Sequence, residues 1–164
     1  MALFFVIVMS TKLDSIDIIL LSNLQKKGRI TNVELAENVG ISAPPCFRRL
    51  KLMESRGIIT GYHAEIDPRA LGYEFRAVCI VSLFSQFLDE VENFVRIIKN
   101  SKNVRSCFST LGNEEFVLTI VAKDLKEYES MLKSRIQSNK AVSGVKTYMT
   151  VNKHKDEYGI PIEE

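Results

Sequence analysis

The first third of the chain places apolar residues at helical spacing. Residues three or four apart share one face of a helix, so this spacing predicts a first helix that begins near Leu13. Lys26 and Lys27 followed by Gly28 are typical of a helix end, because cations suit the last turn and glycine permits the chain to reverse. The apolar positions are Leu13, Ile16, Ile19 or Leu20, and Leu24.

A capping sequence marks the start of a second, shorter helix. Thr31 precedes Glu34 by three positions, so the hydroxyl can accept the Glu34 amide proton while the carboxylate bonds back to the threonine amide. The second helix is therefore expected over Asn32 to Asn38. Gly40 supplies a turn, and Ser42 is expected to cap a third helix whose first turn tolerates two prolines.

The third helix is expected to bury one face and expose another. Cys46, Leu50 and Met53 recur at positions i, i+4 and i+7 and are predicted to face the core. Two short helices joined by a glycine turn, after a longer first helix, are typical of a helix-turn-helix, whose second helix enters the major groove of DNA. The residues left toward the groove are Ala43, Pro44, Phe47, Arg48 and Lys51.

Positive charge is concentrated on this third helix. The 164 residues carry 22 basic and 20 acidic side chains, a net charge of +2 that does not by itself indicate a nucleic-acid partner. Residues 42–56, however, hold four basic side chains against Glu54 alone, a local charge of +3, whereas residues 67–164 hold 14 of each sign. Such a local excess is expected where phosphates are neutralised, although a solvated basic helix is the competing interpretation.

The basic side chains are predicted to divide by role. Arg48 and Lys51 are expected to reach base edges or phosphates. Arg49 and Arg56 are expected to contact the DNA backbone or to stabilise the domain. Phe47 is a candidate for contact with thymine methyl groups, with half-buried packing as the alternative.

The segment after the third helix has the composition of a strand. Ile58 to Ile66 is rich in β-branched and aromatic residues and ends at Asp67 and Pro68. A strand outside the main sheet needs a partner, and dimerisation would supply one. His63 lies here without a Cys or His at ligand spacing, so it is predicted to be a surface residue.

The second half of the chain predicts an antiparallel sheet with two helices. The order β-α-β-β-α-β places both helices on one face, so the other face requires a cover, which a second copy of the chain would provide. This half is thus expected to serve oligomerisation and ligand binding. The predicted strands are Phe75–Leu83, Val104–Leu111, Phe116–Val121 and Val145–Val151. The first predicted helix has its apolar stripe at Phe87, Val91, Phe94 or Val95, and Ile98, and the second has its apolar stripe at Leu125, Tyr128, Leu132 and Ile136.

Enzymatic chemistry finds no support in the sequence. It contains no glycine-rich phosphate loop, no nucleophile elbow and no cluster of His, Cys and acidic residues. No catalytic activity, cofactor or metal site is expected. Cys46, Cys79 and Cys107 are odd in number and widely spaced, which favours small core residues in a reducing cytoplasm over a disulfide framework.

The chain starts with an apolar run, Ala2 to Met9. Eight apolar residues cannot span a bilayer, and a secretory signal would carry a positive segment before them and small residues at a cleavage site. No membrane partner is expected. Residues 1–12 are interpreted as a disordered N-terminus, or as the result of a start codon assigned too far upstream, with Met9 as the true first residue. The alternative is that the apolar run forms a buried N-terminal strand.

Several stretches in register resemble the Lrp/AsnC (leucine-responsive, feast/famine) family of transcriptional regulators. The likeness extends from Leu13 to about Val151, and its strongest carriers are residues 13–17, 28–36, 40–42, 49–54 and 57–62. It implies an α+β protein: a winged helix-turn-helix domain joined by a strand to a ferredoxin-like βαββαβ domain that regulates amino-acid metabolism (RAM domain). It also implies homodimers that assemble into tetramers or octamers, wrap double-stranded DNA and respond to amino acids.

The resemblance also implies an effector site between dimers, near the loop before the second strand of the RAM domain and at the hairpin that follows this strand. Gly112 fits the family pattern, and Glu115 can stand in for the acid that holds an amino group. Glu114 departs from it, because an aromatic or apolar residue is more usual there. Its added carboxylate would repel an effector's carboxylate, which favours a cationic or polar amino acid or no effector. The alternative to an effector site is a hairpin turn whose acidic side chains are exposed to water and bind no ligand. The candidate effector residues are Val104, Cys107, Thr110, Gly112, Asn113, Glu114, Glu115 and Phe116.

The sequence therefore predicts a cytoplasmic, nucleoid-associated, sequence-specific regulator. An architectural protein that bends DNA with little sequence choice is the second interpretation, and a metabolite-binding module the third. The expected divisions are residues 1–12, a DNA-binding domain over 13–57, a connector over 58–72, the RAM domain over 73–152 and a tail over 153–164. The candidate DNA-binding residues are Thr31, Asn32, Ser42, Ala43, Pro44, Phe47, Arg48, Arg49 and Lys51.

Overall fold

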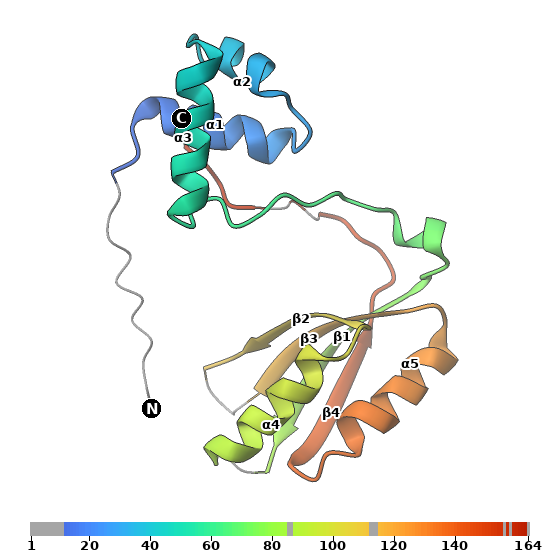
Figure 1. Ribbon diagram of the computed structural model, residues 1–164. Coiled ribbons are helices and arrows are strands. Elements are labelled where there is room, and N and C mark those ends of the chain that lie inside the picture. Colours follow the sequence, from blue (N-terminus) through green and yellow to red (C-terminus); the bar gives the residue numbers. More distant parts are fainter. Residues whose placement is uncertain (1–11, 85–86, 112–114, 156, 158, 164) are drawn as a thin grey trace. The chain divides into compact units, whose positions relative to one another are not determined.

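The computed structural model describes residues 12–84, 87–111, 115–155, 157 and 159–163 (Figure 1). The chain divides into two compact units. The first unit runs to Glu65 and also includes the C-terminal segment from residue 156, and the second unit is Ile66–Lys155. The expectations for the N-terminal run, a displaced start or a buried strand, lie outside the described residues.

Three helices build the first unit, as the sequence predicts. They are α1 (Ser15–Lys26), α2 (Asn32–Asn38) and α3 (Ala43–Ser55). The spacing of apolar residues brings one face of each helix into a common core, which half-buried residues such as Ile16, Leu24 and Ile30 extend. The buried members of that core are Leu20, Leu35, Ala36, Cys46, Leu50 and Met53.

Glycines end the second and third helices. Gly40 and Gly57 have φ angles of 69° and 70°, a left-handed conformation that a side chain would disfavour. After α3, the Ile58 amide bonds to the Met53 carbonyl at 2.9 Å and the Gly57 amide to the Glu54 carbonyl at 3.0 Å. These two bonds form a Schellman motif, which turns the chain away from the helix axis and fixes where the connector begins.

Within this single chain the connector forms no strand, and the expected strand, whose partner would come from a second copy, stays a prediction. The amides of Ile58 and Ile59 bond back to the Met53 carbonyl, and residues 60–67 belong to no strand. A β-strand requires a neighbour for its backbone groups, and within the part of the chain that the structure describes this segment has none. Pro68–Leu71 instead forms a short 3₁₀-helix (η1), capped by the Asp67 side chain.

The second unit is a four-stranded antiparallel sheet with the predicted order of elements. The sheet order is β2-β3-β1-β4, so the chain's first and third strands lie in the centre. The strands are β1 (Phe75–Leu83), β2 (Val104–Ser109), β3 (Glu115–Ala122) and β4 (Val142–Met149), and the helices are α4 (Leu88–Lys99) and α5 (Leu125–Met131), the latter continued by a π-helical turn, η2 (Leu132–Gln137).

Both helices pack on one face of this sheet (Figure 1). Along β1 the buried residues alternate with less buried ones, because neighbouring side chains of a strand point to opposite faces. Phe94 and Ile98 of α4 and Tyr128 and Ile136 from the α5 segment cover the inner face, as predicted. The strand residues of this core include Phe75, Ala77, Cys79, Val81, Leu83, Phe116, Leu118, Ile120 and Ala122.

Some predicted boundaries and burials were wrong. Phe87 and Leu125 are 77% and 54% exposed, because each lies at the start of its helix, beyond the edge of the core. The last strand begins at Val142, three residues earlier than expected, since Val142 pairs with Leu83 across a register shift. Alternation predicts such strand ends poorly where a bulge interrupts the pairing.

The C-terminal segment contacts the first unit. The side-chain amide of Gln25, in the last turn of α1, donates to the carbonyl of Ile160 at 2.7 Å and accepts its amide proton at 3.2 Å. The side chain thus bonds both backbone groups of one residue. The sequence predicts a C-terminal tail over residues 153–164, and the structure groups residues 156–164 with the helical unit.

Candidate nucleic-acid interface and ligand-binding hairpin

The orientation of α3 depends on Arg49. One guanidinium nitrogen, Nη1, lies 2.7 Å from Oδ2 of Asp14 and 2.8 Å from Oδ1 of Asp17. Both carboxylates belong to the start of α1, where they also form a capping box with each other's backbone amides. Arg49 therefore joins the middle of α3 to the first turn of α1, a structural role that the sequence offered as one of two alternatives.

These contacts change the acid–base behaviour of the groups. The pKa of Asp14 lies below its ordinary value, chiefly because the Asp17 amide donates to its carboxylate and then because of Arg49. Hydrogen bonds to Asp17 and then Asp14 raise the pKa of Arg49. Two acids now offset part of the +3 charge counted along residues 42–56, so the cationic surface is narrower than the sequence suggests.

Two candidate residues at the start of α2, its N-cap Thr31 and its first residue Asn32, have structural partners. The Thr31 hydroxyl accepts the Glu34 amide proton at 3.2 Å and the Glu34 carboxylate accepts the Thr31 amide proton at 2.9 Å, which confirms the predicted capping box. The Asn32 side chain donates to the Ala43 carbonyl at 3.0 Å and so fastens the start of α3 to α2. Both side chains help to hold the two helices of the motif in place.

The exposed face of α3 contains most of the residues assigned to the groove. Pro44, Phe47, Arg48 and Lys51 are exposed, and Arg48 has no hydrogen bond or ion pair with any other described residue. Ala43 was expected there too, but it is half-buried, because this first residue of α3 packs against the core of the first unit.

Ser42 lies at the N-cap of α3, as expected, but its side chain makes no capping hydrogen bond. The two prolines occupy the second and third helical positions and remove two of the amides that such a bond would satisfy. The exposed Ser42 hydroxyl is therefore not used to cap the helix.

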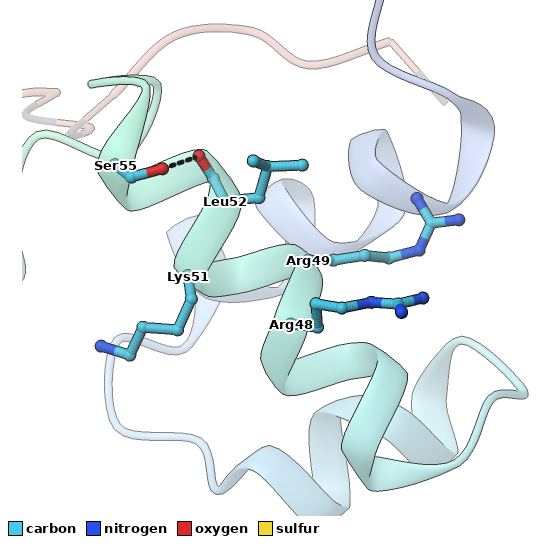
Figure 2. A pocket seen from close by; sticks show the side chains of 5 residues that line it. All are labelled: Arg48, Arg49, Lys51, Leu52 and Ser55. Carbon is cyan, nitrogen blue, oxygen red and sulfur yellow. Dashed lines mark hydrogen bonds between the residues drawn. The ribbon is translucent and has the colours of Figure 1, made fainter.

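A shallow hollow of about 610 Å³ lies along the second half of α3, lined by Arg48, Arg49, Lys51, Leu52 and Ser55. Figure 2 shows the side chains of Arg48 and Arg49 extending to one side of the helix and Lys51 to the other. The hydroxyl of Ser55 donates back to the Leu52 carbonyl at 2.9 Å. Leu52 is 45% exposed, a contact surface that the sequence analysis missed although it is one turn beyond Arg48.

Lys51 belongs to a second cluster that the sequence analysis missed. Its Nζ donates to Glu54 at 2.7 Å and lies 5.6 Å from the ring centroid of Phe47. The hydroxyl of Tyr62, in the connector, donates to the same carboxylate at 3.1 Å. The positions i, i+4 and i+7 within α3 could have indicated the first three members, whereas the Tyr62 contact depends on the turn at Gly57.

The candidate effector residues on β2 are only in part accessible. Val104 and Cys107 are half-buried and pack against the core of the sheet, and Thr110 is exposed after the strand ends. Val104 pairs with Ile120 and Cys107 with Leu118, whose side chains are both fully buried. Of these three candidates, only Thr110 offers an exposed side chain for direct ligand contact.

The other effector candidates surround the hairpin. Residues 112–114 lie outside the described residues, and Glu115 is the first residue of β3. Phe116 is 5% exposed, and its ring centroid lies 4.9 Å from that of Phe94. Phe116 therefore belongs to the core, and its proposed ligand contact requires the backbone or a rearrangement.

The described residues contain no metal-binding cluster and no membrane-spanning helix. Among them, no group of three His, Cys, Asp or Glu side chains could bind a metal ion. No described helix is long and apolar enough to cross a membrane. Cys46 and Cys79 are buried and Cys107 is half-buried, consistent with their predicted packing role. Burial raises the pKa of the Cys46 thiol, which disfavours the reactive thiolate.

Comparison with known proteins matches both units. The profile of a winged helix-turn-helix DNA-binding domain matches residues 13–60, and that of the Lrp/AsnC ligand-binding domain matches residues 76–160. A leucine-responsive regulatory protein of Rhizobium meliloti is 39% identical over 149 residues, which cover 91% of this chain and 96% of that protein. The transcriptional regulator AzlB of Bacillus subtilis is 30% identical, with 95% and 99% covered.

Solved structures also match this fold. A transcriptional regulator of Neisseria meningitidis, determined as an L-Met complex, superposes with a TM-score of 0.86 and 31% identity over 91% of this chain and 96% of its own. A leucine response regulatory protein of Mycobacterium tuberculosis gives 0.78 and 28%, with 92% and 100% covered. The chain therefore belongs to the Lrp/AsnC family of transcriptional regulators, with a DNA-binding helix-turn-helix and a ligand-binding domain.

Proposed function

We propose that this regulator acts as an oligomer that binds particular DNA sequences through α3 and responds to an amino acid. The observation that carries the DNA contact is the exposed face of α3, with Arg48 unpaired among the described residues and α3 held against α1 by Arg49. A helix presented rigidly fits the major groove without a large ordering cost.

The residues of this face have different proposed roles. Arg48 reads base edges or phosphates, and Phe47 and Pro44 contact the groove through apolar surface. Lys51 contacts phosphate, while Thr31, Asn32 and Arg49 act mainly by holding the helices in place. Ser42 and Ala43 lie at the start of α3, where the backbone approaches the phosphates.

DNA retention at moderate salt tests this assignment. Replacing Arg48 and Lys51 together by glutamine is expected to abolish retention of a mixed duplex pool, because both cationic contacts of the exposed face are lost. Retention equal to that of the unaltered protein would refute the assignment. Footprinting genomic fragments then separates the two kinds of DNA binder: discrete sites support a regulator, and uniform protection supports an architectural protein.

The proposed effector is an amino acid bound near the β2–β3 hairpin. Support comes from the match to a ligand-binding domain and from the related Neisseria meningitidis regulator, which was solved with L-Met. Glu115, the first residue of β3, is the proposed partner of the ligand's amino group, and the exposed Thr110, after the end of β2, is a second proposed contact. The acidic residues of the hairpin favour a polar or cationic amino acid over leucine.

Thermal unfolding with each of the twenty amino acids tests the effector. A ligand at a hundred times its dissociation constant is expected to stabilise the fold by about 2.7 kcal/mol, which raises the Tm by several degrees. Glu115→Gln should remove that shift. If no amino acid raises the Tm, the proposed amino-acid response is wrong and the regulator works without one.

The open face of the sheet supports the proposed homodimer. Strand alternation places Val78, Ile80, Val117 and Tyr148 on the face opposite α4 and α5, together with Phe108, which is 64% exposed. A single chain would leave these apolar side chains in water, and pairing with a second copy would bury them. Phe84, Phe87, Leu88 and Leu111, all strongly exposed, offer further surface for tetramers or octamers.

Sedimentation velocity of Phe108→Asp tests the homodimer. The substitution places a charge on the proposed interface and is expected to reduce the assembly to a smaller species. Leu125→Asp is the matched control, because Leu125 is 54% exposed and lies on a helix covering the other face. Unchanged assembly in Phe108→Asp would exclude the sheet face as the interface.

A further inference from the structure

A stripe of interacting side chains runs along α3 and into the connector. Phe47, Lys51 and Glu54 are separated by four and three residues, so they share one face of the helix. The Lys51 ammonium lies between the Phe47 ring, 5.6 Å from its centroid, and the Glu54 carboxylate, 2.7 Å from its Oε2. Two neighbours on the same helix thus hold this cation from both sides.

Tyr62 holds the other end of the stripe. Its hydroxyl donates at 3.1 Å to Oε1, the carboxylate oxygen of Glu54 that Lys51 does not use. Glu54 is therefore bonded to the exposed face of α3 through one oxygen and to the connector through the other. Hydrogen bonds from Lys51 and then Tyr62 hold the pKa of Glu54 below its ordinary value of 4.5, so it is charged near neutral pH.

The Lys51–Glu54 pair is suited to exchange. The Lys51 side chain is 58% exposed and that of Glu54 is 29% exposed, and exposed pairs of this kind contribute little to stability. A DNA phosphate competes well for the cation, because contact with it releases condensed counterions. After such an exchange, Glu54 remains bonded to Tyr62 as a negative charge beside the contact.

We propose that Glu54, anchored by Tyr62, is a positioning residue that raises sequence discrimination. It orients Lys51 and repels phosphates that approach the helix in a wrong register, so that misplaced complexes are penalised more than the correct one. Repulsion of wrong arrangements is a general route to specificity. The inference rests on the proposed contact between α3 and DNA, and it assigns a role to a residue whose charge has the same sign as the DNA.

Glu54→Gln tests the proposal in the full-length protein. Binding to a random-sequence duplex is measured over a series of salt concentrations, and preferred sequences are selected from a randomised duplex pool. The variant is expected to bind the random duplex several-fold more tightly, with a salt slope steeper by up to about 0.9 for a newly contacted phosphate. It should also select a less defined sequence than the unaltered protein.

Two further variants identify the cause. Lys51 exchanges Glu54 for phosphate on the preferred sequence, but on a random duplex it stays paired with Glu54 in the unaltered protein. Adding Lys51→Gln to Glu54→Gln should therefore cancel the gain in salt slope, because only the loss of Glu54 frees this cation to contact a phosphate of the random duplex. Tyr62→Phe keeps every charge but removes the anchor, so it should broaden the selected sequences while the salt slope stays the same. Glu129→Gln removes an equal charge from the exposed surface of α5 and should change neither quantity.

The possible outcomes separate this inference from the proposed function. If Glu54→Gln has the salt slope and selected sequence of the unaltered protein, Glu54 does not position Lys51. A lowered Tm with equal loss of affinity for all duplexes would also overturn the inference, since it indicates a structural role alone. If the unaltered protein retains no duplex at all, the proposed DNA contact itself fails.

Discussion

Arg49 serves two carboxylates at once, and this explains why an arginine suits the position. Its guanidinium can donate to Asp14 and Asp17 together, and both acids already bond to backbone amides of α1. A lysine ammonium, a compact point charge on a flexible stem, would hold such a geometry less firmly. The ion pairs and the helix cap therefore depend on each other.

Arg49→Gln is expected to lower the Tm by about 5 °C, because two repelling carboxylates lose their shared cation. Circular dichroism during heating measures the change. Arg48→Gln is the matched control: it removes the same charge one residue away, from a side chain with no partner among the described residues. That control should leave the Tm unchanged and weaken DNA binding, and equal Tm losses in both variants would contradict the assigned roles.

Asp14 predicts how stability depends on pH. Its pKa lies below the ordinary value of 3.8 in the folded chain, so the unfolded chain binds its proton more readily. The contribution of the ionised Asp14 to the stability of the fold is therefore fully present above pH 3.8. It is lost as the pH falls through the lower pKa that Asp14 has in the folded chain. Acid titration followed by circular dichroism should show that Arg49→Gln loses less stability on acidification than the unaltered protein, because the variant lacks one cause of the lowered Asp14 pKa. An identical loss of stability in both proteins would contradict this.

At the scale of elements, local signals specified the helices well. The Thr31 capping box and the apolar spacing of Cys46, Leu50 and Met53 are confirmed, because each involves residues within two turns of one helix. The Asp14 capping box was missed, since an aspartate replaces the usual glutamate at its third position. Strand order was also predictable, because the βαββαβ sequence of elements admits few arrangements.

Contacts between distant elements could not be predicted in the same way. The Arg49–Asp14 contact joins residues 35 positions apart, and nothing in the local pattern couples them. Tyr62 reaches Glu54 only because the Schellman turn after α3 reverses the chain. The connector strand also lies beyond local patterns, because β-branched composition favours a strand but its expected partner belongs to a second copy of the chain.

The N-cap residues of α2 and α3 are expected to contribute differently to the stability of the helix-turn-helix. Thr31→Ala should destabilise the first unit by about 1 kcal/mol, because its hydroxyl satisfies an amide that the helix itself leaves unbonded. Ser42→Ala is the matched control, since the Ser42 side chain makes no capping bond, and its effect should be much smaller. Chemical denaturation measures both, and a larger loss in Ser42→Ala would contradict the observed capping.

At the scale of the whole molecule, the chain connects its two units twice. The connector leaves the helical unit after α3, and the segment after β4 returns to that unit, where Gln25 bonds both backbone groups of Ile160. Gly159, with a φ angle of 96°, precedes this contact, and a Cβ there would lie 2.3 Å from the Gln25 side chain. Only glycine fits this position with the contact intact.

Gly159→Ala is therefore expected to release the C-terminal segment from α1. Hydrogen exchange should show faster exchange of the Ile160 amide, and Gln25→Ala should produce the same change, with little further effect in the double variant because both remove one contact. Gly28→Ala is the control, since a Cβ at Gly28 meets no atom within 4 Å. Slow exchange at Ile160 in Gly159→Ala would show that the segment is held by something other than Gln25.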